Sequence, residues 1–157
     1  MRTLREAVDD FLAQKRIAVA GFSRKKDQPA NLILKKLRGG GREVFAVNPA
    51  AGEIHGERCY PDLGAIPGGV DAVIVATHPE VTPRVVEQCV ELGIRRVWMH
   101  RSFGAGSVSA EAVRRGREAG LTVIDGACPM MFCKPVDPAH LCMRWILRLA
   151  GKLPGPG

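Results

Sequence analysis

The sequence predicts an α/β fold in which a doubly wound, parallel β-sheet lies between two layers of helices. Two observations lead to this prediction. Short apolar runs rich in β-branched residues alternate with segments whose apolar residues recur at helical spacing. Several of these apolar runs contain almost no polar residue, as expected for strands covered by helices on both faces of a sheet.

The chain opens with a helix and the first strand of this sheet. Thr3 and Glu6 have the spacing of a capping box, and the helix that they begin is expected to end near Lys15. The apolar run at 17–23 contains a glycine near its end and predicts a buried strand.

Four further strands bring the predicted sheet to about five, at residues 43–47, 71–77, 95–100 and 121–125. Helices are expected to begin near Pro29, Thr82, Ser109 and Asp137. The connection at 48–70 looks irregular, with one short extra strand near 58–60. The pattern as a whole is Rossmann-like, with three layers in the order α/β/α.

Length and composition restrict the class of protein. A chain of 157 residues predicts one domain, here 1–150, followed by a frayed tail at 151–157. No apolar run is long enough for a membrane span and the start does not resemble a signal peptide, so we expect a cytoplasmic protein without a membrane partner. The five scattered cysteines are then expected to be free thiols.

The net charge of +7 indicates that the chain attracts anions. Nucleic acid is not the expected partner, because the basic residues are dispersed and aromatic residues, on which bases stack, make up only 5% of the chain. A phosphorylated small molecule fits the composition better.

Ligands of open parallel sheets bind beyond the carboxyl ends of the strands, where the strand order reverses. In this chain four such ends carry polar or glycine residues: Gly21-Phe22-Ser23, Asn48-Pro49, Thr77-His78-Pro79 and His100-Arg101-Ser102. The first is followed by Arg24, Lys25 and Lys26, and then by a helix whose first amides can face an anion. This loop is therefore the predicted phosphate site. We also expect a side chain at Gly21 to block the ligand without disturbing the fold.

The loop departs from the dinucleotide-binding fingerprint in two ways. Ser23 and Lys26 occupy the positions of the second and third glycines, and Asn48-Pro49 replaces the acidic residue that would hold a ribose. The missing carboxylate and the added cations favour a ligand with more phosphate charge than NAD. NADP and coenzyme A (CoA) both qualify.

Five segments in order, IAVAGFSRKKDQPAN, EVFAVNP, DAVIVATHP, WMHRSFG and VIDGACP, resemble the CoA-binding domain family. These small proteins are similar to the amino-terminal domain of the succinyl-CoA synthetase alpha subunit, and the resemblance covers residues 10–133. It implies that CoA phosphates are held by Gly21, Phe22, Ser23, Arg24 and Lys25. It also implies that the adenosine and pantetheine path is lined by Asn48, Pro49, Thr77, His78 and Pro79, with Arg101 and Ser102 across the crevice.

The resemblance implies binding rather than catalysis, because the second domain of the synthetase subunit, which carries a phosphorylated histidine, has no counterpart here. We therefore expect a module that binds CoA or an acyl-CoA, with no catalytic residue. The alternatives are an NADP-dependent oxidoreductase that uses the same crevice and, as a third class, a nucleic-acid-binding protein.

Several other residues have two interpretations. His78 and His100 follow strands, but no carboxylate falls at a neighbouring strand end, so a catalytic role is not favoured. Cys128 is either a small buried apolar residue or a thiol that forms a mixed disulfide with CoA. No metal site is expected, because on a helix that starts at Pro138 the side chains of His140 and Cys142 would diverge. The stripe Leu141, Trp145, Ile146 and Leu149 is interpreted as core packing, with a face for a second copy or for another protein as the alternative.

Overall fold

The structure is a computed structural model that describes residues 2–154. Its strands are β1 (Arg16–Ala20), β2 (Glu43–Val47), β3 (Glu53–Ile54), β4 (Glu57–Tyr60), β5 (Ala72–Val75), β6 (Arg96–Met99) and β7 (Thr122–Asp125). Its helices are α1 (Leu4–Leu12), α2 (Pro29–Gly39), α3 (Thr82–Glu91), α4 (Ala110–Glu118) and α5 (Pro138–Leu149), with short 3-10 turns η1 (Leu63–Ala65) and η2 (Pro129–Met131).

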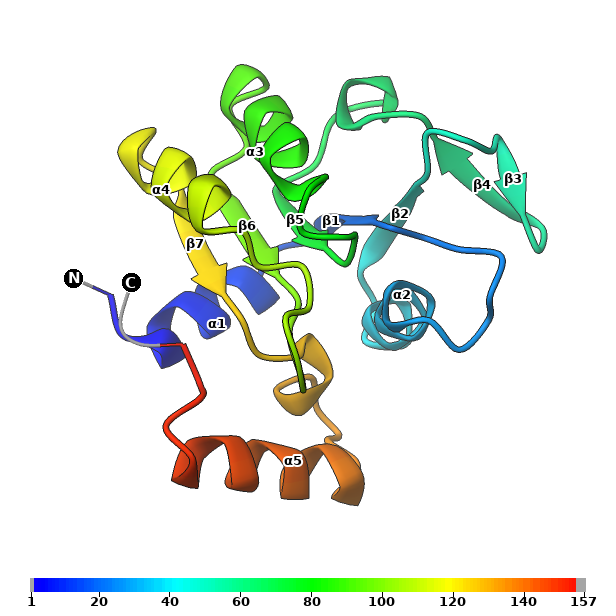
Figure 1. Cartoon of the computed structure of the whole chain (residues 1–157). Coiled ribbons are helices and arrows are strands. Elements are labelled where there is room, and N and C mark those ends of the chain that lie inside the picture. Colours follow the sequence, from blue (N-terminus) through cyan, green and yellow to red (C-terminus); the bar gives the residue numbers. More distant parts are fainter. Residues whose placement is uncertain (1, 155–157) are drawn as a thin grey trace.

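The strands form one sheet in the order β3-β4-β2-β1-β5-β6-β7 (Figure 1). Every neighbouring pair is parallel except β3 and β4, which form an antiparallel hairpin. The predicted doubly wound α/β class is confirmed. The described sheet has seven strands rather than about five, because the connection at 48–70 supplies two: the expected strand near 58–60 and its partner β3.

Helices cover both faces of the sheet, as predicted. One core cluster joins α1 and α2 to alternate strand residues such as Ile17 and Ile74, and a second joins α3 and α4 to the intervening ones, such as Ala18 and Val73. Figure 1 shows α1 and α2 below the sheet and α3 and α4 above it. Because successive side chains of a strand point to opposite faces, strands buried on both sides read as continuous apolar runs.

The register places the carboxyl ends of the central strands level with one another. Ala20 of β1 pairs with Val47 of β2 on one side and with Val75 of β5 on the other. The chain leaves β1 toward β2 through α2 below the sheet and leaves β5 toward β6 through α3 above it. The strand order therefore reverses between β1 and β5, where ligands of such sheets bind.

Helix α5 corrects one expectation. Leu141, Trp145, Ile146 and Leu149 are all exposed, so they do not pack in the core. Leu147 is the one fully buried residue of this helix, and it packs against Cys128 and Met131 beside η2. The helical spacing of apolar residues predicted this helix correctly. However, the stripe of Leu141, Trp145, Ile146 and Leu149 faces away from the core.

Among the described residues, no helix combines the length and the apolar character needed to cross a membrane.

Candidate ligand-binding site

Gly21 is the first residue beyond β1, and its conformation is set by the end of β5. Its φ is +103°, and a Cβ atom there would lie 2.3 Å from the carbonyl oxygen of Ala76 and 3.1 Å from the amide of Thr77. Its N–H donates to Val47 of β2. The glycine is therefore required for close packing of three strand ends, and the expectation that a side chain there would block only the ligand is wrong.

The following loop is fixed by two asparagines. The Asn31 side chain of α2 accepts a hydrogen bond from the Ser23 amide (2.9 Å) and donates to the Ser23 carbonyl (2.7 Å). The Asn48 side chain, at the end of β2, donates to the carbonyl of Phe22 (2.8 Å). The Phe22 ring is buried in the core cluster below the sheet, so only the backbone of Phe22 is available to a ligand.

The cations of the loop face outward. Arg24, Lys25 and Lys26 are all exposed, and none forms an ion pair with a carboxylate in residues 2–154. Helix α2, which follows the loop, has no acidic residue in its first turn and no side-chain cap. The positive end of the helix dipole therefore adds to the field of the loop, and the arrangement suits an anion.

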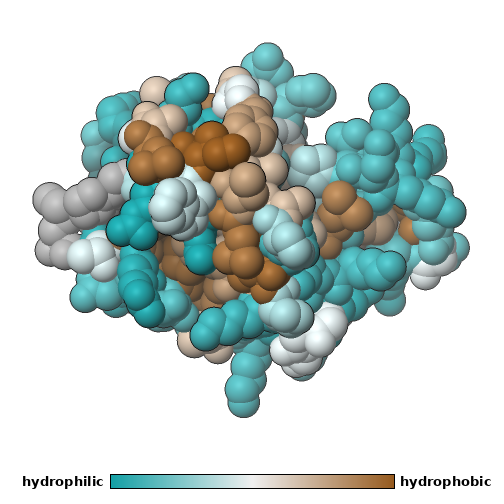
Figure 2. All heavy atoms as spheres, turned by 90° about the horizontal axis from the view of Figure 1, so that it is seen from below, coloured by the Kyte–Doolittle hydropathy of each residue, from teal (hydrophilic) through white to brown (hydrophobic). Residues whose placement is uncertain are grey.

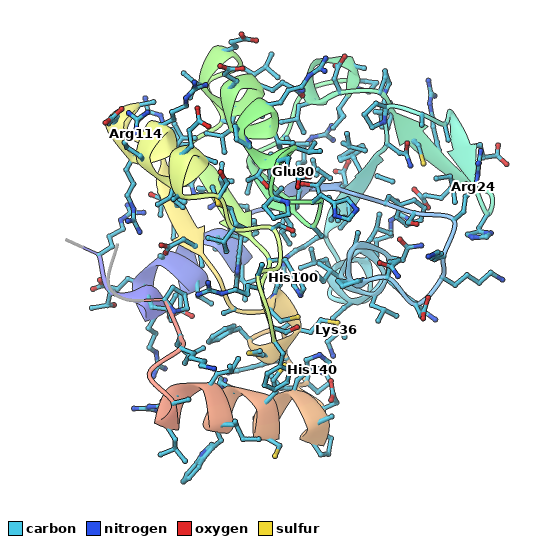
Figure 3. The ribbon with its side chains drawn as sticks, viewed as in Figure 1. Arg24, Lys36, Glu80, His100, Arg114 and His140 are labelled. Carbon is cyan, nitrogen blue, oxygen red and sulfur yellow. The ribbon has the colours of Figure 1, made fainter. Side chains whose placement is uncertain are left out.

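The β3–β4 hairpin contacts this loop. The Nε2 atom of His55 lies 2.6 Å from the carbonyl oxygen of Arg24, and Figure 3 shows Arg24 beside the hairpin. His55 itself has a φ of +54°, in the turn between the two strands. Sequence reasoning missed this histidine, because the residues that it connects are far apart in the chain and the hairpin was not expected.

The residues expected at the next two strand ends lie close to the loop. Asn48 contacts it directly, and Pro49 is exposed beside Asn48. Thr77 follows Ala76, against which Gly21 packs; His78 is exposed and Pro79 is partly exposed. The Thr77 hydroxyl donates to the carbonyl of His78 (3.1 Å). The structure thus brings together the predicted groups of β1, β2 and β5.

Two hydrogen bonds that were not expected from the sequence connect the loop after β6 to the loop after β5 and to the start of α3. The Ser107 hydroxyl donates to the Thr77 carbonyl (2.6 Å), and the buried Thr82 hydroxyl donates to the Ser107 carbonyl (2.7 Å). Helix α3 begins at Thr82, as expected, and the hydroxyl of this residue is directed to the neighbouring loop. These hydrogen bonds hold the loop that contains Ser107 against the carboxyl end of β5.

Arg101 and Ser102 lie one strand further along the sheet. The Arg101 guanidinium lies next to Gly126, where a Cβ atom would be 3.3 Å from it, and Arg101 lines an open hollow of about 700 Å³ beside α4. Ser102 is partly exposed. Among the described residues no hydrogen bond or ion pair connects Arg101 or Ser102 to the β1–α2 loop. Strand β5 lies between β1 and β6 in the sheet.

His100 is buried at the end of β6, between that strand and η2 (Figure 3). Burial lowers the pKa of its imidazole to about 4, so the ring is neutral near pH 7. Within the described residues, the histidine paired with a carboxylate is His140, whose Nδ1 lies 2.6 Å from Asp137. His100 therefore lacks the carboxylate that would activate it as a base.

Cys128 follows β7 and precedes η2. Burial raises the pKa of its thiol to about 11, so it is protonated near pH 7. Cys142 is exposed whereas His140 is directed to Asp137. In residues 2–154 no three His, Cys, Asp or Glu side chains are grouped as metal ligands would be.

The chain is similar in sequence to known proteins. The chain is 33% identical to the YneT protein of Bacillus subtilis over 114 residues, which are 73% of this chain and 82% of that protein. It is 40% identical over 75 residues to an ADP-forming acetate–CoA ligase of Archaeoglobus fulgidus, covering 48% of this chain but only 11% of the ligase.

Among solved structures, a hypothetical protein from Pyrococcus horikoshii superposes with a TM-score of 0.72 and 32% identity, covering 80% of this chain and 86% of that one. The sequence model that describes a CoA binding domain matches residues 15–134, which span β1 to η2 and include every strand end discussed above. The chain therefore belongs to the CoA-binding domain family.

Proposed function

We propose that this protein binds CoA or an acyl-CoA at the carboxyl edge of β1, β2 and β5, and that it does so as a binding module rather than as an enzyme. The observation that carries the proposal is the loop of Arg24, Lys25 and Lys26, three exposed cations without carboxylate partners in the described residues. The loop lies within the part of the chain that matches the CoA binding domain.

The chemistry of the loop fits the phosphates of CoA. Its two asparagine contacts and the His55 contact hold the backbone in one shape before any ligand arrives, which lowers the entropy that binding must overcome. Phosphate oxygens accept charge-assisted hydrogen bonds from arginine and lysine and from helix-terminal amides. Asn48 replaces the carboxylate that would repel an additional phosphate.

Isothermal titration of the protein with CoA, NADP⁺ and NAD⁺ tests the proposal. CoA is expected to bind most tightly, and Lys25→Glu is expected to abolish that preference. Arg95→Glu is a matched control, because Arg95 is exposed just before β6, at the opposite edge of the sheet. Tighter binding of NADP⁺ than of CoA would instead support an oxidoreductase, and equal loss in both variants would place the ligand elsewhere.

The non-catalytic part of the proposal has its own test. We expect no acyl-CoA to form when the pure protein is mixed with acetate or succinate, ATP and CoA, because neither His78 nor His100 has an acid–base partner among the described residues. Acyl-CoA formation at enzymic rates, detected by chromatography, would show that the chain is an enzyme.

A further inference from the structure

The outer face of α5 is apolar and uncovered in the described chain. Leu141, Trp145, Ile146 and Leu149 are 40%, 68%, 51% and 77% exposed, respectively. In Figure 1 this helix is the outermost element below the sheet, and Figure 2, which views that side, shows apolar residues gathered across it. Scattered exposed leucines are common on protein surfaces, but a continuous apolar stripe of this kind usually marks an interface.

Helical geometry organises this face into two rows. At about 100° per residue, Leu141, Trp145 and Leu149 follow one another at four-residue steps and form the first row. Cys142 and Ile146 form a second row beside it, and Cys142 is an exposed free thiol. The two rows together cover about 140° of the helix surface, which is wide enough for a second helix to lie against them.

The exposed area suits a pair of helices. A large side chain presents about 200 Å² when fully exposed, so the four apolar residues offer on the order of 500 Å² per copy. Two copies pairing through this face would bury about 1,000 Å² from these residues alone, and the flanking residues would add to it. This is the size at which specific interfaces begin. We therefore expect a dimer of modest affinity.

The charges along one edge of the face select the orientation of the pair. Asp137 and Arg148 are eleven residues apart, which is three turns and about 20°, so they lie on the same edge at opposite ends of the helix. Asp137, which also contacts His140, is 42% exposed, and Arg148 is exposed without an ion-pair partner in residues 2–154. In an antiparallel pair, Asp137 of one copy lies beside Arg148 of the other, and the two-fold axis repeats this contact at the other end of the helix pair. A parallel pair would set this edge of one helix against the opposite edge of the other, so Asp137 and Arg148 would not meet.

We infer that the occupant of this face is a second copy of the chain, with the two α5 helices antiparallel about a two-fold axis. A two-fold interface uses the same patch on both copies, which a self-complementary apolar stripe with opposite charges at its ends satisfies. Pairing Asp137 with Arg148 centres the axis between residues 142 and 143. The two Cys142 thiols then face one another across that axis. This inference is independent of the proposed ligand.

Sedimentation equilibrium of the full chain over a range of concentrations tests the pairing. We expect a monomer–dimer equilibrium with a dissociation constant in the micromolar range. Trp145→Ser and Leu149→Ser should each raise that constant at least tenfold. Leu32→Ser is the matched control, because Leu32 is 44% exposed on α2 and should leave the constant unchanged. A chain that stays monomeric up to millimolar concentration, or a dimer insensitive to both α5 variants, would overturn the inference.

Oxidative cross-linking tests whether the two-fold axis lies beside Cys142. Copper–phenanthroline with dissolved oxygen removes two electrons and two protons from a pair of thiols and joins them as a disulfide. We expect it to give a covalent dimer from the parent protein and none from Cys142→Ser. A dimer in sedimentation that gives no Cys142 cross-link would show that the helices do not pair antiparallel about this axis.

Discussion

A Cβ atom on Gly21 would lie 2.3 Å from the carbonyl oxygen of Ala76, a distance that real Cβ atoms do not occupy. The contact joins the ends of β1 and β5, the two strands between which the strand order reverses. The fold and the candidate site therefore depend on the same residue.

Gly21→Ala is expected to destabilise the protein by more than about 3 kcal/mol, because it adds a backbone collision to the cost of a positive φ. Gly41→Ala is the matched control, since Gly41 has a φ of +81° and no atom within 4 Å of an added Cβ. That variant should lose only about 1 kcal/mol. Urea denaturation measures both, and equal losses would show that β1 and β5 do not approach so closely.

Asn48→Asp is expected to reduce stability by about 1–3 kcal/mol and to weaken CoA binding. A carboxylate cannot donate to the carbonyl of Phe22, as the Asn48 amide does, and it adds negative charge beside the proposed phosphate site. Thermal unfolding and titration with CoA measure the two effects. Unchanged CoA affinity in a destabilised variant would mean that Asn48 holds the loop but lies away from the ligand.

Most of the sheet could be predicted from the sequence, because a strand buried on both faces leaves an apolar run that few other structures produce. The β3–β4 hairpin was harder to predict from the sequence. Its strands have two and four residues, and within them Ile54 and Cys59 are the buried positions. So short and polar a segment looks like a loop until its pairing with β2 is known.

The site was predictable only in part. The strand ends could be named, since the position of a site in a parallel sheet follows from the fold. The contacts of His55, Asn31 and Ser107 could not, because each depends on how a loop folds against another part of the chain. Helix α5 shows a different limit: periodicity identifies an apolar face but does not say whether the same chain or another molecule covers it.

One thiol per chain is expected to react rapidly with Ellman's reagent at pH 8, and all five after denaturation. Cys142 is exposed, whereas the other four cysteines are buried. Burial raises the pKa of Cys89 to about 12 and that of Cys128 to about 11, which leaves little reactive thiolate. The assay requires dilute protein, so that α5 is unpaired. Cys142→Ser should remove the fast phase, and rapid labelling of Cys128 would favour its redox role.

Stability is expected to fall as the pH falls from about 6.5 toward 4, through His100. Its pKa is about 4 in the folded chain against an ordinary value of 6.5, so in this window the unfolded state binds the extra proton. The stabilisation is complete above pH 6.5, and about 3 kcal/mol of it is lost by pH 4. His100→Gln should flatten this part of the profile, measured by urea denaturation. An identical slope in the variant would show that other groups are responsible.

The 3′-phosphate of CoA gives the most direct test of the loop as a phosphate site. It carries about −1.5 to −2 charges near neutral pH, which dephospho-CoA lacks. Because a charge-assisted hydrogen bond contributes roughly 1.5–3 kcal/mol, CoA should bind at least about tenfold more tightly than dephospho-CoA. Arg24→Ala or Lys25→Ala should reduce that ratio, and Arg95→Ala should leave it unchanged. Isothermal titration of both ligands against the parent and the three variants measures this ratio of affinities. The predicted result is a ratio that shrinks only in the loop variants. Equal affinities of the parent for CoA and dephospho-CoA would contradict the account.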